Sequence, residues 1–279
     1  MRTLDFAGRS VPAIGMGTWY MGEGHAPKAR EADALRAGLD AGLVVVDTAE
    51  MYADGGAEEV VGEALAGRRD QAVLVSKVYP HNASRTGVRQ ACQRSLARLR
   101  TDRIDVYLLH WRGRHPLSET VAGFEELVRE GMIGSWGVSN LDADDLRELG
   151  QVPGGGACVT DQVLYNLTRR GPELDPFPVA AQAGMSIMAY SPLEQARLFD
   201  APGAEALTSI ARRHEATAAQ VALAWTIRDG NVLAIPKTAD PARARENAAA
   251  LELELTAEDL AELDRAFPAP ARPVPLEML

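Results

Sequence analysis

Two patterns of hydrophobic and polar residues alternate along the chain. Apolar runs without polar interruption, such as residues 44–46 and 73–75, are typical of strands buried on both faces of a parallel sheet. Between such runs, apolar residues recur at three- and four-residue spacing, as at Val88, Cys92, Leu96 and Leu99, which predicts amphipathic helices. About eight strand–helix units follow one another with short loops, and this favours a closed (β/α)8 TIM barrel over an open doubly wound sheet.

Segments at both ends of the chain extend this repeat. Residues 3–6 and 10–13 flank Ala7-Gly8-Arg9 and predict a β-hairpin that plugs one end of the barrel. Beyond the last strand, helices are predicted near residues 241–250 and 256–267, followed by a Pro-rich tail. The predicted fold class is therefore α/β: a (β/α)8 TIM barrel with an N-terminal β-hairpin and extra C-terminal helices, in a single domain over residues 1–279.

Local signals predict where individual elements begin. Thr217 and Gln220 have the spacing of a capping box at the start of a helix. Ser118 is the predicted N-cap of the helix that follows the strand over residues 104–110. The first strand of the barrel is predicted over residues 14–19.

Composition argues against several classes of protein. Hydrophobic residues make up 46% of the chain, enough for a large core, and the formal net charge of −10 argues against nucleic acid or an anionic membrane as partner. Cys92 and Cys158 lie among small and apolar residues, so we interpret them as buried thiols without a disulfide or a metal. The N-terminus lacks the apolar core of a signal peptide, and no apolar run approaches the ~20 residues of a membrane span. We therefore expect a cytoplasmic protein.

Four polar residues lie at or just after the ends of predicted strands. Asp47 ends the valine run, and Tyr52 lies on the loop that follows it. Lys77 and His110 end two later strands. In a parallel barrel the carboxyl ends of the strands form one rim, and that rim carries the chemistry. Each residue alone is more commonly a turn, surface or core residue, but four at successive strand ends favour an active site.

Together these side chains predict a general acid. Free tyrosine has a pKa near ~10, which a neighbouring ammonium lowers, and a buried carboxylate keeps that ammonium charged. Lys77 and Asp47 suit these roles toward Tyr52, while a neutral imidazole at His110 can orient a carbonyl. The motifs Gly-x-Ser-x-Gly and His-Glu-x-x-His are absent. An external hydride donor, a nicotinamide cofactor, would complete the reaction.

The same segments resemble the catalytic signatures of the aldo-keto reductase superfamily. The resemblance rests on Asp47-Thr48-Ala49-Glu50-Met51-Tyr52, on Lys77 and on Leu108-Leu109-His110-Trp111, and it extends from residue 14 to the C-terminal helices. Short bacterial members with methylglyoxal reductase activity are the most similar. The resemblance implies that Tyr52 donates the proton, that Lys77 and Asp47 tune its pKa, and that His110 helps to bind the carbonyl.

The resemblance also implies a cofactor site on this rim. In the family, Ser, Asn and Gln side chains hold the carboxamide of the nicotinamide, a Tyr stacks on its ring, and later segments meet the pyrophosphate and the adenosine. The matching positions are Ser139, Asn140, Gln162, Tyr190, Ser191, Leu193, Lys237, Thr238, Arg243, Glu246 and Asn247. Lys237 and Arg243 offer the cations that a 2′-phosphate requires, and this favours NADPH over NADH.

A substrate pocket is predicted next to these residues. Trp19, Tyr20, His81 and Trp111 lie just past the rim-facing ends of strands, so they are predicted to wall an apolar pocket. Because the tail after Phe267 is short, we expect this pocket to be open and tolerant of varied carbonyls.

The sequence thus predicts a monomeric, cytoplasmic, NADPH-dependent reductase of aldehydes, ketones and α-dicarbonyls. Its expected partner is a small-molecule carbonyl substrate, with no nucleic acid, no membrane and no metal. Two alternatives stay open. A regulatory or sensor protein on the same scaffold would bind NADPH without turnover. A metal-dependent barrel hydrolase would need clustered His and carboxylate ligands at the rim, which the sequence does not show.

Overall fold

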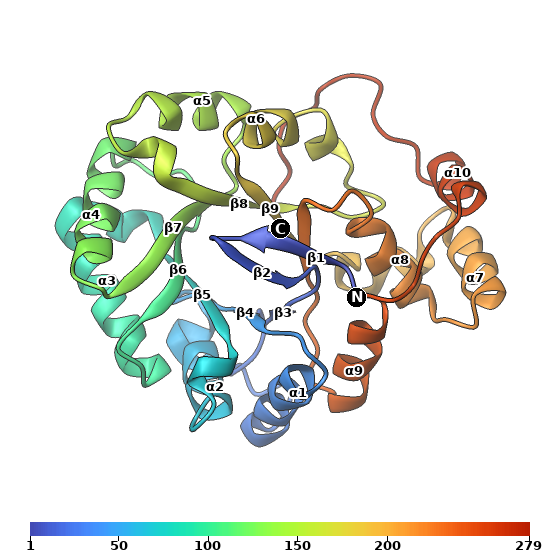
Figure 1. Ribbon diagram of the computed structural model, residues 1–279, viewed down its shortest axis with the longest axis horizontal. Coiled ribbons are helices and arrows are strands. Elements are labelled where there is room, and N and C mark those ends of the chain that lie inside the picture. Colours follow the sequence, from blue (N-terminus) through green and yellow to red (C-terminus); the bar gives the residue numbers. More distant parts are fainter.

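Eight parallel strands close into a barrel at the centre of the computed structural model, which describes residues 1–279 (Figure 1). In chain order they are β3 (Met16–Gly17), β4 (Val45–Asp47), β5 (Val73–Val78), β6 (Ile104–Leu109), β7 (Ile133–Ser139), β8 (Cys158–Leu164), β9 (Ser186–Tyr190) and β10 (Val232–Ile235). Each strand pairs with the next one along the chain. The ends of the sheet meet through parallel bridges from Ile14 to Ala234 and from Gly17 to Lys237. The predicted (β/α)8 barrel is confirmed.

Two glycines let the first and last strands approach one another and their neighbours. A Cβ atom at Gly17 would lie 2.8 Å from the carbonyl oxygen of Ile235, and one at Gly15 would lie 2.9 Å from that of Val45. Only glycine permits such close backbone contact. The first strand is shorter than the predicted 14–19, because the chain turns at Thr18, whose carbonyl accepts the N–H of Met21 at 2.9 Å.

Helices surround the barrel. The ring consists of α1 (Lys28–Asp40), α2 (Gly56–Ala64), α3 (Arg85–Leu99), α4 (Leu117–Arg129), α5 (Ala143–Gln151), α6 (Phe177–Gln182), α8 (Ala218–Thr226) and α9 (Pro241–Ala249). Two further helices, α7 (Ala204–Arg213) and α10 (Ala257–Ala266), pack against each other outside it, at the right of Figure 1. The apolar stripe predicted for α3, from Val88 to Leu99, is buried. No helix is both long enough and apolar enough to span a membrane.

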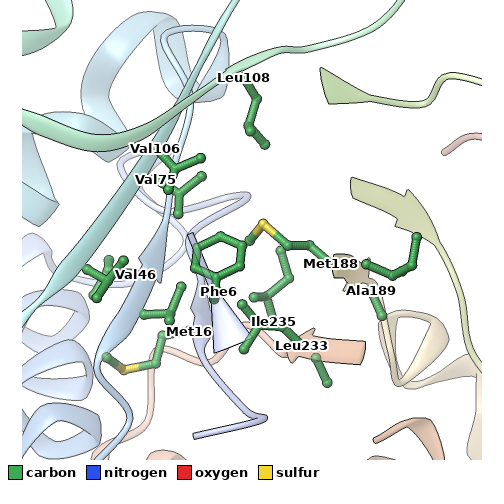
Figure 2. Packing of buried hydrophobic residues seen from close by; sticks show 14 of the residues in the cluster. Phe6, Met16, Val46, Val75, Val106, Leu108, Met188, Ala189, Leu233 and Ile235 are labelled. Carbon is green, nitrogen blue, oxygen red and sulfur yellow. The ribbon is translucent and has the colours of Figure 1, made fainter. Parts of the chain in front are cut away.

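The predicted N-terminal hairpin is present and closes the amino-terminal end of the barrel. It consists of the antiparallel strands β1 (Thr3–Phe6) and β2 (Arg9–Pro12). Figure 2 shows Phe6 pointing into the barrel among Val46, Val75, Met188 and Leu233, and its side chain is fully buried. Because the hairpin fills the amino-terminal end of the barrel, a functional site is expected at the opposite end, where the carboxyl ends of the strands lie.

Helix starts follow the predicted signals with one exception. The capping box at Thr217 and Gln220 is present at the start of α8. The prediction of Ser118 as an N-cap is wrong, because α4 begins at Leu117 and Pro116 occupies the cap position. Proline is favoured at helix starts, since it has no N–H to leave unpaired. Ser118 therefore lies within the first turn.

Candidate active site

The four predicted catalytic side chains lie together at the carboxyl ends of the strands. Asp47 ends β4, and Tyr52 begins the short turn η1 (Tyr52–Gly55). Lys77 lies near the end of β5, and His110 follows β6 directly. The Nζ atom of Lys77 is 2.8 Å from each carboxylate oxygen of Asp47 and 3.2 Å from the hydroxyl oxygen of Tyr52. The ring centroids of Tyr52 and His110 are 5.6 Å apart.

Lys77 and Asp47 form a buried ion pair whose polar atoms are all occupied. Lys77 also donates to the carbonyl of Thr48 at 2.9 Å, and Asp47 accepts the side-chain amide of Gln162 at 2.8 Å. Burial lowers the pKa of Lys77 and raises that of Asp47, while their mutual attraction opposes both shifts. Removing two charges from water is costly unless such further hydrogen bonds complete the pair. Here they do, and we infer that both groups are ionised.

Tyr52 is a fully protonated phenol in this environment. The prediction that Lys77 brings its pKa down is wrong for this structure: burial raises the pKa of Tyr52 well above its usual value of 10.0, and the charge of Asp47 adds to the shift. The ammonium of Lys77 acts in the opposite direction, but the carboxylate of Asp47, 2.8 Å from that ammonium, offsets its charge. Tyr52 therefore keeps its proton through the neutral range, the state that a proton donor needs.

His110 is a neutral imidazole beside this phenol. Its ring is buried, and burial together with the charge of Lys77 lowers its pKa well below the usual 6.5. Its Nδ1 atom has no hydrogen-bond partner in the protein. Trp111 packs on the ring with centroids 4.8 Å apart. A neutral, orientable imidazole of this kind can hydrogen-bond a bound carbonyl without bringing a second charge to the site.

Two adjoining cavities open at the rim and share Trp19, Tyr52 and Tyr190 in their walls. The smaller, which we call the catalytic cavity, has a volume of about 190 Å³ and is also lined by His110. The other, the large cavity, has a volume of about 580 Å³ and extends to α9. No group of three or more His, Cys, Asp and Glu side chains in the structure is placed to hold a metal ion.

The predicted substrate-pocket residues are only partly gathered around the catalytic cavity. Trp19 and Trp111 line it, whereas Tyr20 stacks on Trp19 and faces the large cavity. The prediction for His81 is wrong, because its exposed ring lies outside both cavities and packs on Tyr79, with centroids 4.7 Å apart. His81 lies three residues past the end of β5, in the turn over Pro80–Asn82, and sequence position alone cannot tell whether such a residue points inward or outward.

The C-terminal tail forms part of the catalytic cavity, which sequence analysis missed. Met278 and Leu279 line this cavity, and Figure 1 places the C-terminus over the barrel. Glu277 pairs with Arg169 at 2.5 Å, and Leu276 packs against the hydrophobic core. The tail is short, but it returns across the rim and supplies part of the cavity wall. The expectation of an open pocket that is tolerant of varied carbonyls stays a prediction. No local pattern in a Pro-rich tail indicates where it docks.

Ser139, Asn140, Gln162 and Tyr190 form an interlocked group of hydrogen bonds beside Tyr52. The hydroxyl of Ser139 donates to the carbonyl of Gln162 at 2.8 Å, and the amide of Asn140 donates to the carbonyl of His110 at 3.2 Å. The hydroxyl of Tyr190 donates to the side-chain oxygen of Asn140 at 3.0 Å. All four line the catalytic cavity. Side-chain amides and hydroxyls fixed in this way are suited to holding a planar amide such as a carboxamide.

The large cavity contains the remaining predicted cofactor residues. They are Ser191, Leu193, Lys237, Thr238, Arg243, Glu246 and Asn247, together with Tyr190. No hydrogen bond or ion pair occupies the side chains of Lys237 and Arg243, so two cations face a cavity without a partner carboxylate. Sequence analysis missed Gln195, Ala196 and Phe199 in this wall, because the loop that carries them has no distinctive composition. The cavity fits a phosphate-bearing ligand larger than the substrate.

Asp161 is a second buried carboxyl close to this group, and sequence analysis did not identify it. It precedes Gln162 in β8 and is fully buried, and neither carboxyl oxygen has a side-chain or backbone partner within hydrogen-bond geometry. Burial raises its pKa well above the usual 3.8, and the nearby Asp145 and Asp142 add to the shift. We infer that Asp161 is an uncharged acid behind the segment that carries Asn140.

Comparison with known proteins places these features in one family. The family model described as "Aldo/keto reductase family" matches residues 13–267. The methylglyoxal reductase YeaE of Escherichia coli (strain K12) is 52% identical over 281 residues, covering 100% of this chain and 99% of that protein.

Solved structures give the same result. The chain is similar to an aldo/keto reductase from Klebsiella pneumoniae in complex with NADP and acetate, with 52% identity and a TM-score of 0.97, covering 100% of this chain and 99% of that one. A structure of an aldo-keto reductase from the same organism in complex with NADPH has the same identity and coverages and a TM-score of 0.96.

The protonation state of Asp161 gives a pH-dependent prediction for stability. Its pKa is raised in the folded state, so the folded protein keeps a proton that the unfolded chain loses as the pH rises above about 4. Its contribution to stability is therefore complete at acid pH and declines at higher pH. Asp161→Asn removes this loss. We expect the variant to exceed the wild type in Tm by roughly 2–4 °C at pH 8, the shift typical of 1 kcal/mol, and by less at pH 4.5. Thermal unfolding followed by circular dichroism tests this, and a pH-independent difference would contradict it.

Proposed function

The chain belongs to the aldo/keto reductase family, and we propose that it reduces small aldehydes, ketones and α-dicarbonyls such as methylglyoxal to alcohols, with NADPH as the reductant and Tyr52 as the proton donor. The observation that carries this proposal is the chain of contacts from the Asp47 carboxylate through the Lys77 ammonium to the Tyr52 hydroxyl, beside a cavity. The similarity to a methylglyoxal reductase and to NADP- and NADPH-bound structures supports it.

Reduction of a carbonyl needs a hydride at carbon and a proton at oxygen. NADPH supplies the hydride. As the new C–H bond forms, the electron pair of the C=O double bond moves to oxygen, and the O–H bond of Tyr52 gives its proton to that oxygen. A developing alkoxide is far more basic than a phenolate, so the transfer is favourable although the pKa of Tyr52 is raised. Lys77, 3.2 Å away, then stabilises the phenolate until solvent restores its proton.

His110 and the aromatic walls position the carbonyl. The neutral imidazole of His110 offers a hydrogen bond without repelling the substrate or the proton donor. Trp19 and Trp111 supply apolar surface to the wall of the catalytic cavity. With about 190 Å³ and a roof formed by Met278 and Leu279, the cavity suits carbonyls of a few heavy atoms.

The residues that we assign to NADPH divide between the two cavities. Ser139, Asn140 and Gln162 would hold the carboxamide, and Tyr190 would lie against the nicotinamide ring. Lys237 and Arg243 would bind the 2′-phosphate at the far end of the large cavity, because they are cations there without a partner. Thr238, Glu246 and Asn247 would surround the adenosine, with Ser191 and Leu193 near the pyrophosphate.

The oligomeric state and the location in the cell are inferred as follows. We infer that the enzyme acts as a monomer. We infer a cytoplasmic location, in keeping with two buried thiols that form no disulfide. The alternative of a sensor that binds NADPH without turnover gives no reason for the complete Asp47–Lys77–Tyr52 arrangement beside His110. Tight NADPH binding without NADPH oxidation across a panel of carbonyls would favour that alternative.

Removing the hydroxyl oxygen of Tyr52 tests its assignment as the proton donor. Tyr52→Phe should lower kcat for methylglyoxal by at least about 100-fold, the usual contribution of a general acid, with the NADPH Kd within twofold of wild type. Tyr79→Phe is the matched control, because Tyr79 lies near His110, with ring centroids 6.3 Å apart, and is absent from both cavity walls. Steady-state kinetics and fluorescence titration provide the two values. Substantial turnover by the Tyr52 variant would refute the assignment.

The proposed 2′-phosphate site predicts cofactor discrimination. Arg243→Ala should weaken NADPH binding about 10- to 100-fold, as expected for loss of a charge-assisted hydrogen bond, and leave NADH binding within twofold. Arg245→Ala on the same helix is the control, because Arg245 donates to the carbonyl of Pro241 and does not line the cavity. Equal losses for the two cofactors in the Arg243 variant would count against a phosphate contact.

The docked tail is expected to limit the size of the substrates that the catalytic cavity accepts. Deleting Met278 and Leu279 should raise kcat/KM for a two-ring aromatic aldehyde about tenfold relative to that for methylglyoxal, because the cavity loses its roof. The Tm should change little, because both residues are largely exposed, at 57% and 46%. An unchanged preference between the two aldehydes would show that the tail does not limit the cavity.

A further inference from the structure

Arg169, on the loop after β8, touches two segments that cover different cavities. Its Nη2 atom lies 3.0 Å and its Nε atom 3.3 Å from one carboxylate oxygen of Glu194. Its Nη1 atom lies 2.5 Å from Glu277 in the tail. Glu194 begins the turn η6 (Glu194–Asp200), which lines the large cavity. One guanidinium therefore connects the wall of the large cavity to the roof of the catalytic cavity.

The segment around Glu194 has a strained backbone. Four residues without the freedom of glycine have positive φ angles there: Ser191 (47°), Glu194 (49°), Gln195 (55°) and Ala196 (70°). Such conformations cost free energy and persist only when surrounding contacts enforce them. The segment is thus able to shift when those contacts change.

The Glu194 carboxylate supplies many of these contacts. It is buried, and it accepts from Asn166 at 2.8 Å and Arg197 at 3.0 Å as well as from Arg169. A ligand in the large cavity would press on the same segment through Gln195, Ala196 and Phe199. Filling the large cavity would therefore hold Glu194, and with it Arg169, in the arrangement seen in the structure.

The C-terminal tail, which follows Phe267, makes an ion pair with the rest of the protein through Glu277 and Arg169. Glu277 is its one ion-paired residue in the structure, and the next two residues line the catalytic cavity. The side chain of Glu277 is 49% exposed, whereas that of Glu194 is 6% exposed. Exposed ion pairs are weak and screened by salt, so the contact with Glu277 is the one that can open.

We propose that Arg169 is a positioning residue that couples the two cavities, so that a dinucleotide bound in the large cavity fixes the tail over the catalytic cavity. This inference rests on the proposed NADPH site. Coupling between sites is reciprocal, so a carbonyl enclosed by the tail would in turn tighten cofactor binding. Arginine suits this role because its planar fork of donors can serve two carboxylates at once.

Trimming of the tail by a carboxypeptidase measures the coupling without any turnover. The partly exposed Leu279 and Met278 are its first targets, and cleavage samples the undocked tail. In the wild type, saturating NADP⁺ should slow release of both residues at least about fivefold, the lower end of typical coupling. In Arg169→Met and Glu277→Gln, NADP⁺ should not slow release. Fluorescence titration should show that Glu277→Gln still binds NADP⁺, with a Kd raised by about the same factor as the protection that is lost, because the coupling is reciprocal.

Arg197→Met is the matched control, because Arg197 contacts the same oxygen of Glu194 but does not contact the tail. This variant should retain the protection by NADP⁺. Protection that persists in the Arg169 and Glu277 variants, or that is absent from the wild type when NADP⁺ is bound, would overturn the coupling alone. Loss of protection in the Arg197 variant would also overturn it. Absence of NADP⁺ binding to the wild type would overturn the proposed function and this inference with it.

Discussion

The buried ion pair between Lys77 and Asp47 is the constraint on which the rest of the site depends. An ammonium and a carboxylate inside a barrel are tolerated only when they meet at close range and their other polar atoms are paired, since each carries a desolvation cost of several kcal/mol. Contacts at 2.8 Å, the carbonyl of Thr48 and the amide of Gln162 meet that condition. Asp47 and Lys77 come from the neighbouring strands β4 and β5, whereas Gln162 comes from β8, so the full set of partners is assembled only when the sheet curves into the barrel.

The same pair explains the state of Tyr52, the proposed proton donor. Because Asp47 offsets the charge of Lys77, Tyr52 experiences mainly its own burial, and its pKa rises. The phenol consequently holds its proton until a stronger base appears beside it. A carbonyl oxygen becomes such a base only as hydride reaches the carbon, so proton transfer is confined to the reaction itself. In the proposed mechanism, Lys77 stabilises the phenolate that follows and need not lower the resting pKa of Tyr52.

The proposed cofactor and substrate sites share parts, which ties binding to chemistry. Tyr190 faces both cavities and donates to Asn140, and Asn140 in turn donates to the carbonyl of His110. Gln162, one of the residues proposed to hold the carboxamide, donates its side-chain amide to Asp47. A change at the proposed nicotinamide site would therefore reach the proposed catalytic residues through single hydrogen bonds. The tail and η6 extend this dependence outward, because both are held by Arg169.

The sequence by itself determined the barrel, its hairpin and the positions at which chemistry could occur. Buried valine runs and helical stripes are local patterns, and Asp47, Lys77 and His110 could be placed on one rim because all parallel strands end there. Only the tertiary structure decided the pKa of Tyr52, the outward direction of His81, the burial of Asp161 and the return of Met278 to the catalytic cavity. The burial of Tyr52 and Asp161 and the return of Met278 depend on contacts between residues far apart in the chain, and the direction of His81 depends on how the chain turns after β5. Local sequence patterns carry no information about either.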